Sequence, residues 1–131
     1  MAEHQCPFCQ SAAKDGWLAN EAACAIWDGF PLSEGHALVI PKRHVASLFD
    51  LTLEEQSAVW SLAAQVRHSL REQLRSDGFN IGLNDGPAAG QTVMHAHIHV
   101  IPRRHGDVPD PRGGVRWVLP SKAAYWLRDA P

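Results

Sequence analysis

Several features that would place a chain in a specialised class are scarce in this sequence. Its 12 lysines and arginines are outnumbered by 14 acidic residues, which gives a formal net charge of -2. Proteins that coat nucleic acid or lie on a membrane surface need a basic excess, so we expect neither kind of partner. No apolar run approaches the roughly 20 residues of a membrane-spanning helix. The N-terminal stretch MAEHQCPFCQ shows no signal-peptide pattern either.

Cysteine is scarce as well, and its number is odd. Of the three cysteines, two form the motif Cys6-Pro7-Phe8-Cys9 and the third is Cys24. In a chain without secretory features, this usage favours a metal or redox pair over a structural disulfide. We therefore expect a cytoplasmic protein. Cys24 falls in a predicted strand and is expected to be a small buried apolar residue.

The rest of the composition is that of a globular domain. Hydrophobic residues make up 45% of the 131 residues and charged residues 20%. This is enough apolar sequence for a single core. Since no internal repeat, low-complexity segment or linker divides the chain, we predict one domain over residues 1–131.

The first half of the chain predicts two strands and one long helix. The strands are expected at residues 22–27 and 36–40, with glycine and proline between them as turn residues. The helix is expected to begin at Thr52, which has capping-box spacing to Glu55. Apolar residues then recur at helical intervals as far as Leu74.

The second half predicts a pair of antiparallel strands. Residues 79–84, FNIGLN, alternate as in a half-buried strand, and the histidine-rich residues 94–102 follow after a glycine-rich loop. The tail offers a short strand near residues 115–119 and a final helical turn. The predicted fold class is α+β, an antiparallel sheet with one long helix packed on it and a short C-terminal segment.

The stretch MHAHIHVIP, residues 94–102, places His95, His97 and His99 at alternate positions. In a strand they would share one face, and the apolar residues between them would share the other. On the simplest interpretation the histidines line a solvated face. Side chains two positions apart stand roughly 7 Å apart and those four apart roughly 13 Å, so one ion cannot easily bind all three. At least one histidine must have another function.

The loop before the histidine row indicates what that function is. Gly90, Gln91 and Thr92 place a glycine, an amide and a hydroxyl at the entrance to the row. Backbone N–H groups in such a turn can hold an anion, and glycine lets a phosphate approach closely. A neutral imidazole beside a bound phosphate is a competent nucleophile at neutral pH. The loop and the row together predict chemistry on phosphorus.

The His-φ-His-φ-His-φ-φ pattern, where φ is hydrophobic, resembles the signature of the histidine-triad (HIT) superfamily of nucleotide hydrolases and transferases. IWDGFPLSEGHALVIPKRH, residues 26–44, and NIGLNDGPAAGQTVMHAHIHVIPR, residues 80–103, are similar to the two halves of that family's domain. With the cysteine motif, the resemblance covers most of residues 6–103 and leaves 104–131 as a C-terminal tail without an assigned role. It implies a single HIT domain.

The resemblance implies a division of roles within the histidine row. His97 would be the nucleophile that attacks the α-phosphorus, and His99 would contact the phosphate and assist the leaving group. Asp28 stands where the family binds the ribose hydroxyls, although a turn residue ahead of Gly29 is the alternative. His36 is expected in the network beneath the site. The phosphates and leaving group would be held by Asn84, Gly90, Gln91 and Thr92.

The spacing of Cys6 and Cys9 is that of a structural zinc site, which needs four ligands. A thioredoxin-like redox pair is the alternative, but in such a pair the motif opens a helix, and we predict no helix after Pro7. The residues alone leave the other two ligands open. The resemblance to zinc-containing relatives implies His44 and His95. We expect the zinc to be structural, and we expect no organic cofactor.

The resemblance also implies an enzyme, a homodimer that hydrolyses a purine nucleoside phosphate through a nucleotidyl-histidine intermediate. Dinucleoside polyphosphates such as diadenosine tetraphosphate are the first expectation, and adenosine phosphoramidates are the alternative. Two other classes stay open. One is a nucleotide-binding regulatory module with little turnover, and the other is a small zinc-stabilised interaction protein without a ligand.

Overall fold

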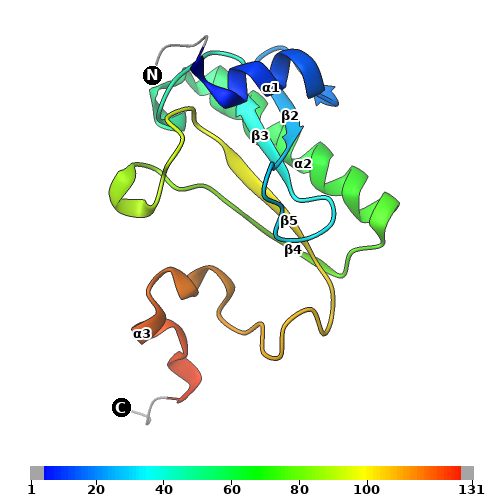
Figure 1. Cartoon of the computed structure of the whole chain (residues 1–131), viewed down its shortest axis with the longest axis vertical. Helices are drawn as coiled ribbons and strands as arrows, with labels where there is room; N and C mark the ends of the chain where they lie inside the picture. Colours follow the sequence, from blue (N-terminus) through cyan, green and yellow to red (C-terminus); the bar gives the residue numbers. More distant parts are fainter. Residues whose placement is uncertain (1–4, 128–131) are drawn as a thin grey trace.

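The computed structural model describes residues 5–127. Its centre is a five-stranded antiparallel sheet with the strand order β1-β2-β3-β5-β4 (Figure 1). Long-range pairing of β3 with β5 joins the two halves of the chain, with Leu38 opposite His99. The α+β class and the β4–β5 pair are therefore confirmed. The strands are β1 Leu18–Ala19, β2 Ala23–Trp27, β3 Ala37–Pro41, β4 Gly78–Gly82 and β5 Ile98–Arg103.

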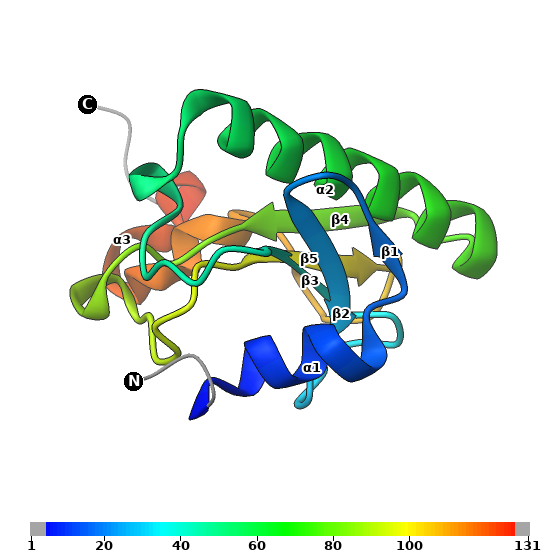
Figure 2. The ribbon, with the colours of Figure 1, turned by 90° about the horizontal axis from the view of Figure 1, so that it is seen from above.

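The long helix α2, Leu53–Leu74, covers one face of the sheet (Figure 2). The predicted capping box is confirmed, because Thr52 Oγ1 accepts from the Glu55 N–H at 3.1 Å and the Glu55 carboxylate accepts from the Thr52 N–H at 3.0 Å. Its apolar side packs on the small and β-branched residues of the strands. Within residues 5–127, no helix is long and apolar enough to cross a membrane.

A second helix, α1 at Pro7–Asp15, lies on the opposite face of the sheet (Figure 2). The expectation of no helix after Pro7 was wrong. The signal was proline at the first helical position, where its missing N–H costs nothing. The helix is short and none of its residues is fully buried, so it was harder to recognise in the sequence than α2. Phe8 and Ala12 nevertheless pack on the side chains of Cys24, Ile26, Leu38 and Ile40.

The prediction that the whole histidine row lies in a strand was wrong. The strand β5 begins at Ile98, so only His99 of the three belongs to it. The Ala96 N–H donates to the Val45 carbonyl at 2.7 Å, in the loop after β3, which draws the preceding backbone away from the sheet. The simplest interpretation, that the histidines line a solvated face, is excluded for two of them, since His95 and His97 are 1% and 8% exposed.

The C-terminal segment projects from the rest of the molecule (Figure 1). The predicted strand near 115–119 was wrong, because Gly114–Val118 form a 3₁₀ helix. The helix α3, Pro120–Ala123, and a 3₁₀ turn at Tyr125–Leu127 follow and supply the expected helical turn. The Arg116 guanidinium donates to the carbonyls of Ala123 and Lys122 at 3.1 and 2.7 Å, which folds the segment on itself instead of extending it.

Candidate functional site

Two clusters of histidine-containing polar side chains lie near the start of β5. One joins Cys6, Cys9, His44 and His95, and the other joins Asp28, His36 and His99. In each cluster, one nitrogen, oxygen or sulfur atom per residue lies within 4.8 Å of the others. His97 lies between them in the sequence, and its ring stands 5.1 Å from that of His99.

The first cluster has the dimensions of a zinc site. His95 Nδ1 lies 3.5 Å from Cys6 Sγ, 3.4 Å from Cys9 Sγ and 3.1 Å from His44 Nδ1. Tetrahedral zinc with its usual bond lengths separates sulfur from nitrogen by about 3.5 Å and nitrogen from nitrogen by about 3.3 Å. The four predicted ligands are thus brought together, and their spacing fits one zinc ion with all four positions filled.

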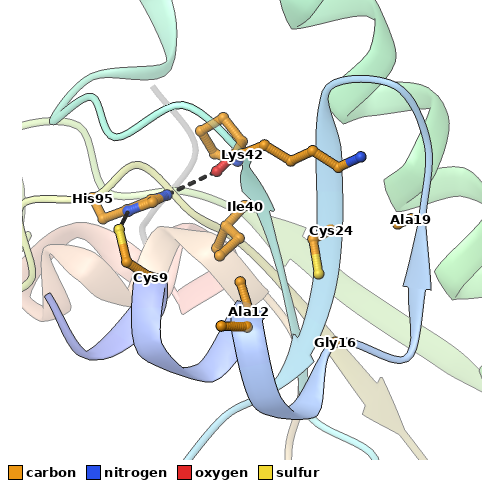
Figure 3. Close-up of a pocket in the computed structure, with 10 residues that line it drawn as sticks. Cys9, Ala12, Gly16, Ala19, Cys24, Ile40, Lys42 and His95 are labelled. Atoms are coloured by element: carbon orange, nitrogen blue, oxygen red, sulfur yellow. Dashed lines mark hydrogen bonds between the residues drawn. The ribbon is translucent and has the colours of Figure 1, made fainter. Parts of the chain in front are cut away.

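The His95 ring is oriented for metal binding. Its Nε2 lies 2.8 Å from the Pro41 carbonyl oxygen (Figure 3). Because a carbonyl only accepts, Nε2 must carry the proton, and this leaves the Nδ1 lone pair directed at the two sulfurs and His44. A ligand histidine whose other nitrogen donates to a backbone carbonyl is the usual arrangement in metal sites.

The redox interpretation of Cys6 and Cys9 cannot be dismissed for lack of a helix, because Cys6 is the N-cap residue of α1. The argument that favours a metal is the pair of imidazoles. Nδ1 of His44 and Nδ1 of His95 both lie within 3.5 Å of Cys9 Sγ. A dithiol that only cycles to a disulfide has no use for two nitrogen lone pairs at its sulfurs.

A pocket of about 500 Å³ opens beside this cluster, between α1 and the strands β1 to β3. Figure 3 shows Cys9 and His95 at one end and Cys24 and Lys42 at the other. Neither His97 nor Asp28 lines it, so it is separate from the site of the predicted chemistry.

His97 is held in a nucleophilic tautomer. Its Nδ1 lies 2.7 Å from the carbonyl oxygen of His95, and since that oxygen only accepts, Nδ1 carries the proton. The other nitrogen, Nε2, therefore keeps its lone pair. The Phe8 ring stands nearly perpendicular to the imidazole, with ring centroids 4.8 Å apart, a contact that sequence reasoning missed.

The second cluster is a chain of directed hydrogen bonds. The Leu32 N–H donates to His36 Nδ1 at 3.0 Å, so the His36 proton is on Nε2. That nitrogen lies 3.0 Å from His99 Nδ1 and 3.3 Å from Asp28 Oδ2. His99 therefore accepts at Nδ1 and carries its own proton on Nε2. A protonated His36 Nε2 cannot bind a metal, so this cluster is a hydrogen-bond network.

Both histidines of this network are neutral at pH 7. Burial, together with the neighbouring imidazoles of His97 and His36, lowers the pKa of His99 from 6.5 to about 4, and Asp28 offsets this only in part. Burial also lowers the pKa of His36, again against the opposing carboxylate of Asp28. His36 lies beneath the site, as expected, and is almost fully buried.

One carboxylate oxygen of Asp28 stabilises the turn, and the other faces the histidines. Its Oδ1 accepts from the Phe30 N–H at 2.8 Å, which fixes the turn after β2. Its Oδ2 faces His36 and His99, at 3.3 and 3.8 Å. The ribose contact stays a prediction, and the structure shows only that the carboxylate lies beside His36 and His99.

The predicted phosphate loop is held together by Gln91. Its Oε1 accepts from the Gly86 N–H at 2.8 Å, and its Nε2 donates to the carbonyls of Ala46 and Val93 at 2.8 and 3.0 Å. The Gln91 side chain thus shapes the loop, and Gly90 makes the turn at a φ of 97°. The other predicted phosphate contacts lie at the ends of this loop, where Asn84 is partly exposed and Thr92 is exposed.

Comparison with known proteins places most of this chain in one family. The model of the HIT domain matches residues 13–106. A bis(5'-adenosyl)-triphosphatase from Dictyostelium discoideum is 40% identical over 91 residues, which cover 70% of this chain and 61% of that protein. An asymmetrical bis(5'-nucleosyl)-tetraphosphatase from Schizosaccharomyces pombe is 42% identical over 77 residues, or 59% of this chain and 42% of that protein. The matched segment thus spans about half the length of these two relatives.

Among solved structures, a zinc-bound histidine triad family protein from Mycobacterium smegmatis is similar over nearly its whole length. It has 36% sequence identity and a TM-score of 0.72, and the match covers 89% of this chain and 92% of the other.

Proposed function

This chain belongs to the HIT domain family, and on that premise we propose that it hydrolyses a nucleoside phosphate by nucleophilic attack of His97. The observation that carries the proposal is the hydrogen bond from His97 Nδ1 to the His95 carbonyl, at 2.7 Å. It leaves the Nε2 lone pair available to phosphorus. As Nε2 attacks and the ring gains positive charge, the carbonyl stabilises the Nδ1 proton.

The proposed reaction has two displacements at one phosphorus. In the first, an Nε2–P bond forms and the bond from phosphorus to the leaving group breaks, which gives a nucleotidyl-His97. In the second, water attacks phosphorus, the N–P bond breaks, and a nucleoside monophosphate is released. Splitting one displacement in this way replaces a difficult step with two easier ones.

His99 is proposed to act as a hydrogen-bond donor to the substrate. Its Nε2 carries the proton because Nδ1 accepts from His36. With a pKa of about 4 it stays neutral at pH 7, so it stabilises charge on a phosphate or leaving-group oxygen without adding a positive charge of its own. His36 and the Leu32 N–H set this tautomer.

We propose a dinucleoside polyphosphate as the substrate, with diadenosine tetraphosphate first. The names of the two relatives support this class, and Asp28 Oδ2 supports a ribose contact beside the triad. Adenosine phosphoramidates are the alternative, because the same two displacements cleave a P–N bond. The loop residues Asn84, Gly90 and Thr92 are proposed to hold the phosphates, and Gln91 to shape that loop.

Cys6, Cys9, His44 and His95 are proposed to hold one structural zinc ion. When bound, the ion supplies folding energy, and a closed four-ligand site leaves no position at which it activates water. The donor spacing supports this assignment, as does the zinc-bound relative.

We propose that two copies of the chain form a homodimer through α2 and β4. In the described part of the chain β4 is the last strand of the sheet, so its outer edge has no strand partner. The side of α2 above β4, where the Arg67 guanidinium lies over the Phe79 ring, carries the exposed apolar residues Leu53 and Trp60. Ile81 on β4 is exposed as well. Sedimentation of a Leu53→Glu/Trp60→Glu variant tests this interface, since a dimer should become a monomer.

The proposed function is tested by incubating the protein with diadenosine tetraphosphate, an adenosine phosphoramidate and a nucleotide sugar, followed by chromatography. We expect AMP from the first, and its release should require His97. Nucleotide binding without turnover would instead establish a regulatory module, and the absence of both would leave a zinc-stabilised interaction protein.

A further inference from the structure

Phe8 stands between the candidate metal centre and the candidate nucleophile. It is the third residue of the Cys6-Pro7-Phe8-Cys9 motif, and its ring lies 4.8 Å from the His97 ring at an interplanar angle of 79°. The same ring lies 6.2 Å from that of His95. The ring also packs on the apolar cluster of Cys24, Ile26, Leu38 and Ile40, so the sheet supports it on the side facing β2 and β3.

The His97 imidazole has two aromatic neighbours, the rings of Phe8 at 4.8 Å and of His99 at 5.1 Å. Its hydrogen bond from Nδ1 to the His95 carbonyl fixes one edge of the ring and still allows the plane to tilt about that bond. A perpendicular aromatic ring at 4.8 Å limits that tilt. Since the Nε2 lone pair lies in the ring plane, the tilt decides whether it points at phosphorus, and in-line attack is sensitive to such alignment.

The metal cluster in turn fixes Phe8. Cys6 is the N-cap residue of α1, and Cys9 lies in its first turn, so the two sulfurs hold that turn on both sides of Phe8. The two sulfurs meet His95 Nδ1 at 3.5 and 3.4 Å. Cys6 is fully buried, and Phe8 also packs on the apolar cluster of the sheet, so the metal cluster and the sheet hold the start of this helix together. A bound zinc ion would therefore fix the place of the Phe8 ring.

We propose that Phe8 is a positioning residue, whose ring holds the plane of the His97 imidazole and through which the metal cluster of Cys6, Cys9, His44 and His95 acts on the nucleophile. The kinetic part of this inference rests on the proposed function. The structural part does not, because the orientation of the His97 ring can be observed without substrate.

The structural part is tested by NMR of the zinc-loaded protein labelled with ¹⁵N-histidine. In the wild type, His97 should show a sharp Nδ1-proton signal, the mark of its hydrogen bond to the His95 carbonyl. In Phe8→Leu, which keeps an apolar side chain but loses the flat ring, the signal should broaden or shift while zinc content stays at one per chain. Phe8→Tyr, which keeps the ring, should restore the wild-type signal.

Ala12→Gly is the matched control, because Ala12 packs on the same apolar cluster from the next turn of α1 but has no ring at His97. It should lower the melting temperature and leave the His97 signal unchanged. A merely structural role for Phe8 predicts the same behaviour for both variants. An unchanged His97 signal in Phe8→Leu would therefore overturn the proposal, whatever the fate of the activity.

The kinetic part is a cycle of four measurements, wild type and Phe8→Leu, each with zinc and after chelation, at a temperature where circular dichroism shows folded protein. We expect Phe8→Leu to lower kcat by about tenfold with a smaller change in KM. Chelation should lower kcat of the wild type and add little in Phe8→Leu, because the coupling has already been removed. Equal losses in both backgrounds would overturn the coupling, and an inactive wild type would refute the proposed function while the NMR result still decides the role of Phe8.

Discussion

The two histidine-containing clusters beside His97 are built from similar residues but differ in what faces their centres, lone pairs in one and a proton in the other. In the cluster of Cys6, Cys9, His44 and His95, the His95 proton points away, to the Pro41 carbonyl, and lone pairs face the centre. In the cluster of Asp28, His36 and His99, the Leu32 N–H occupies one nitrogen of His36 and forces a proton into the centre. The first can bind a cation, and the second is already joined by hydrogen bonds.

The difference shows that proximity of metal-ligating side chains does not by itself define a metal site. Whether a cluster can bind a metal depends on the hydrogen-bond partner of the ring nitrogen that points away from it. A carbonyl at that nitrogen leaves a lone pair directed into the cluster, and an amide N–H there leaves a proton directed into it. Each of the following predictions alters one of the two clusters.

The largest expected effect comes from opening the metal cluster. Cys6→Ser should reduce zinc from one ion per chain to none and lower the melting temperature by about 10 °C, because the energy of metal binding contributes to folding. Mass spectrometry of the metal and calorimetry measure the two quantities. Cys24→Ser, at a buried cysteine outside the cluster, should keep its zinc. Full zinc occupancy in Cys6→Ser would remove the metal assignment.

Breaking the hydrogen-bond network should affect the reaction and leave the metal in place. In His36→Phe, His99 Nδ1 loses its donor and both tautomers of His99 become populated, so kcat should fall by about 30-fold with zinc unchanged. His36→Gln, whose amide can still donate, should lose less. Equal losses in the two variants would show that His36 acts by packing and does not set the tautomer of His99.

Asp28 should have a smaller effect, and on binding. A ribose contact is made in the ground state and in the transition state alike, so Asp28→Ala should raise KM by about tenfold with little change in kcat. Asp28→Asn keeps an oxygen that can accept from the Phe30 N–H but removes the negative charge, so it distinguishes the role of the turn from the role of the charge. A large loss of kcat at an unchanged KM would contradict the ribose role.

The smallest expected effect is on stability in acid. The pKa of His99 is about 4 in the folded protein and 6.5 ordinarily, so above pH 6.5 neither state binds the proton. Between these values the unfolded chain takes up a proton that the folded chain does not, and stability falls as the pH drops from about 6.5 to about 4. Loss of zinc in acid adds to this fall, so the test is the comparison with His99→Asn, whose melting temperature should depend less steeply on pH. Parallel pH dependences would contradict the buried neutral His99.

Much of the fold could be predicted from local patterns. The capping box at Thr52 and the apolar periodicity of α2 are properties of a few neighbouring residues, and both were confirmed. The strand predicted at FNIGLN was confirmed as β4, although its burial does not alternate and Ile81 is exposed. The helix α1 was missed because it is short and none of its residues is fully buried, with Phe8 and Ala12 packed on the apolar cluster of the sheet. In the C-terminal segment, the apolar residues near 115–119 led to the prediction of a strand, but Gly114–Val118 form a 3₁₀ helix.

The candidate site was predictable in its residues and not in its proton positions. The resemblance implied the four proposed zinc ligands, and the structure shows that these side chains lie close together. The tautomers of His36, His97 and His99 depend on bonds to Leu32 and to the His95 carbonyl, which no sequence pattern encodes. The contact of Phe8 with His97 likewise depends on where α1 lies in three dimensions.

The claim at the centre of this account is that Nε2 of His97 forms a covalent bond to phosphorus. The most direct test is to mix the enzyme with diadenosine tetraphosphate, quench within milliseconds under conditions that preserve phosphoramidates, and map the adenylyl group by peptide mass spectrometry. We predict the modification on His97 and on no other histidine, with none in His97→Ala. Steady release of AMP with an unmodified His97, together with inversion of configuration at a chiral phosphorothioate, would contradict the covalent mechanism.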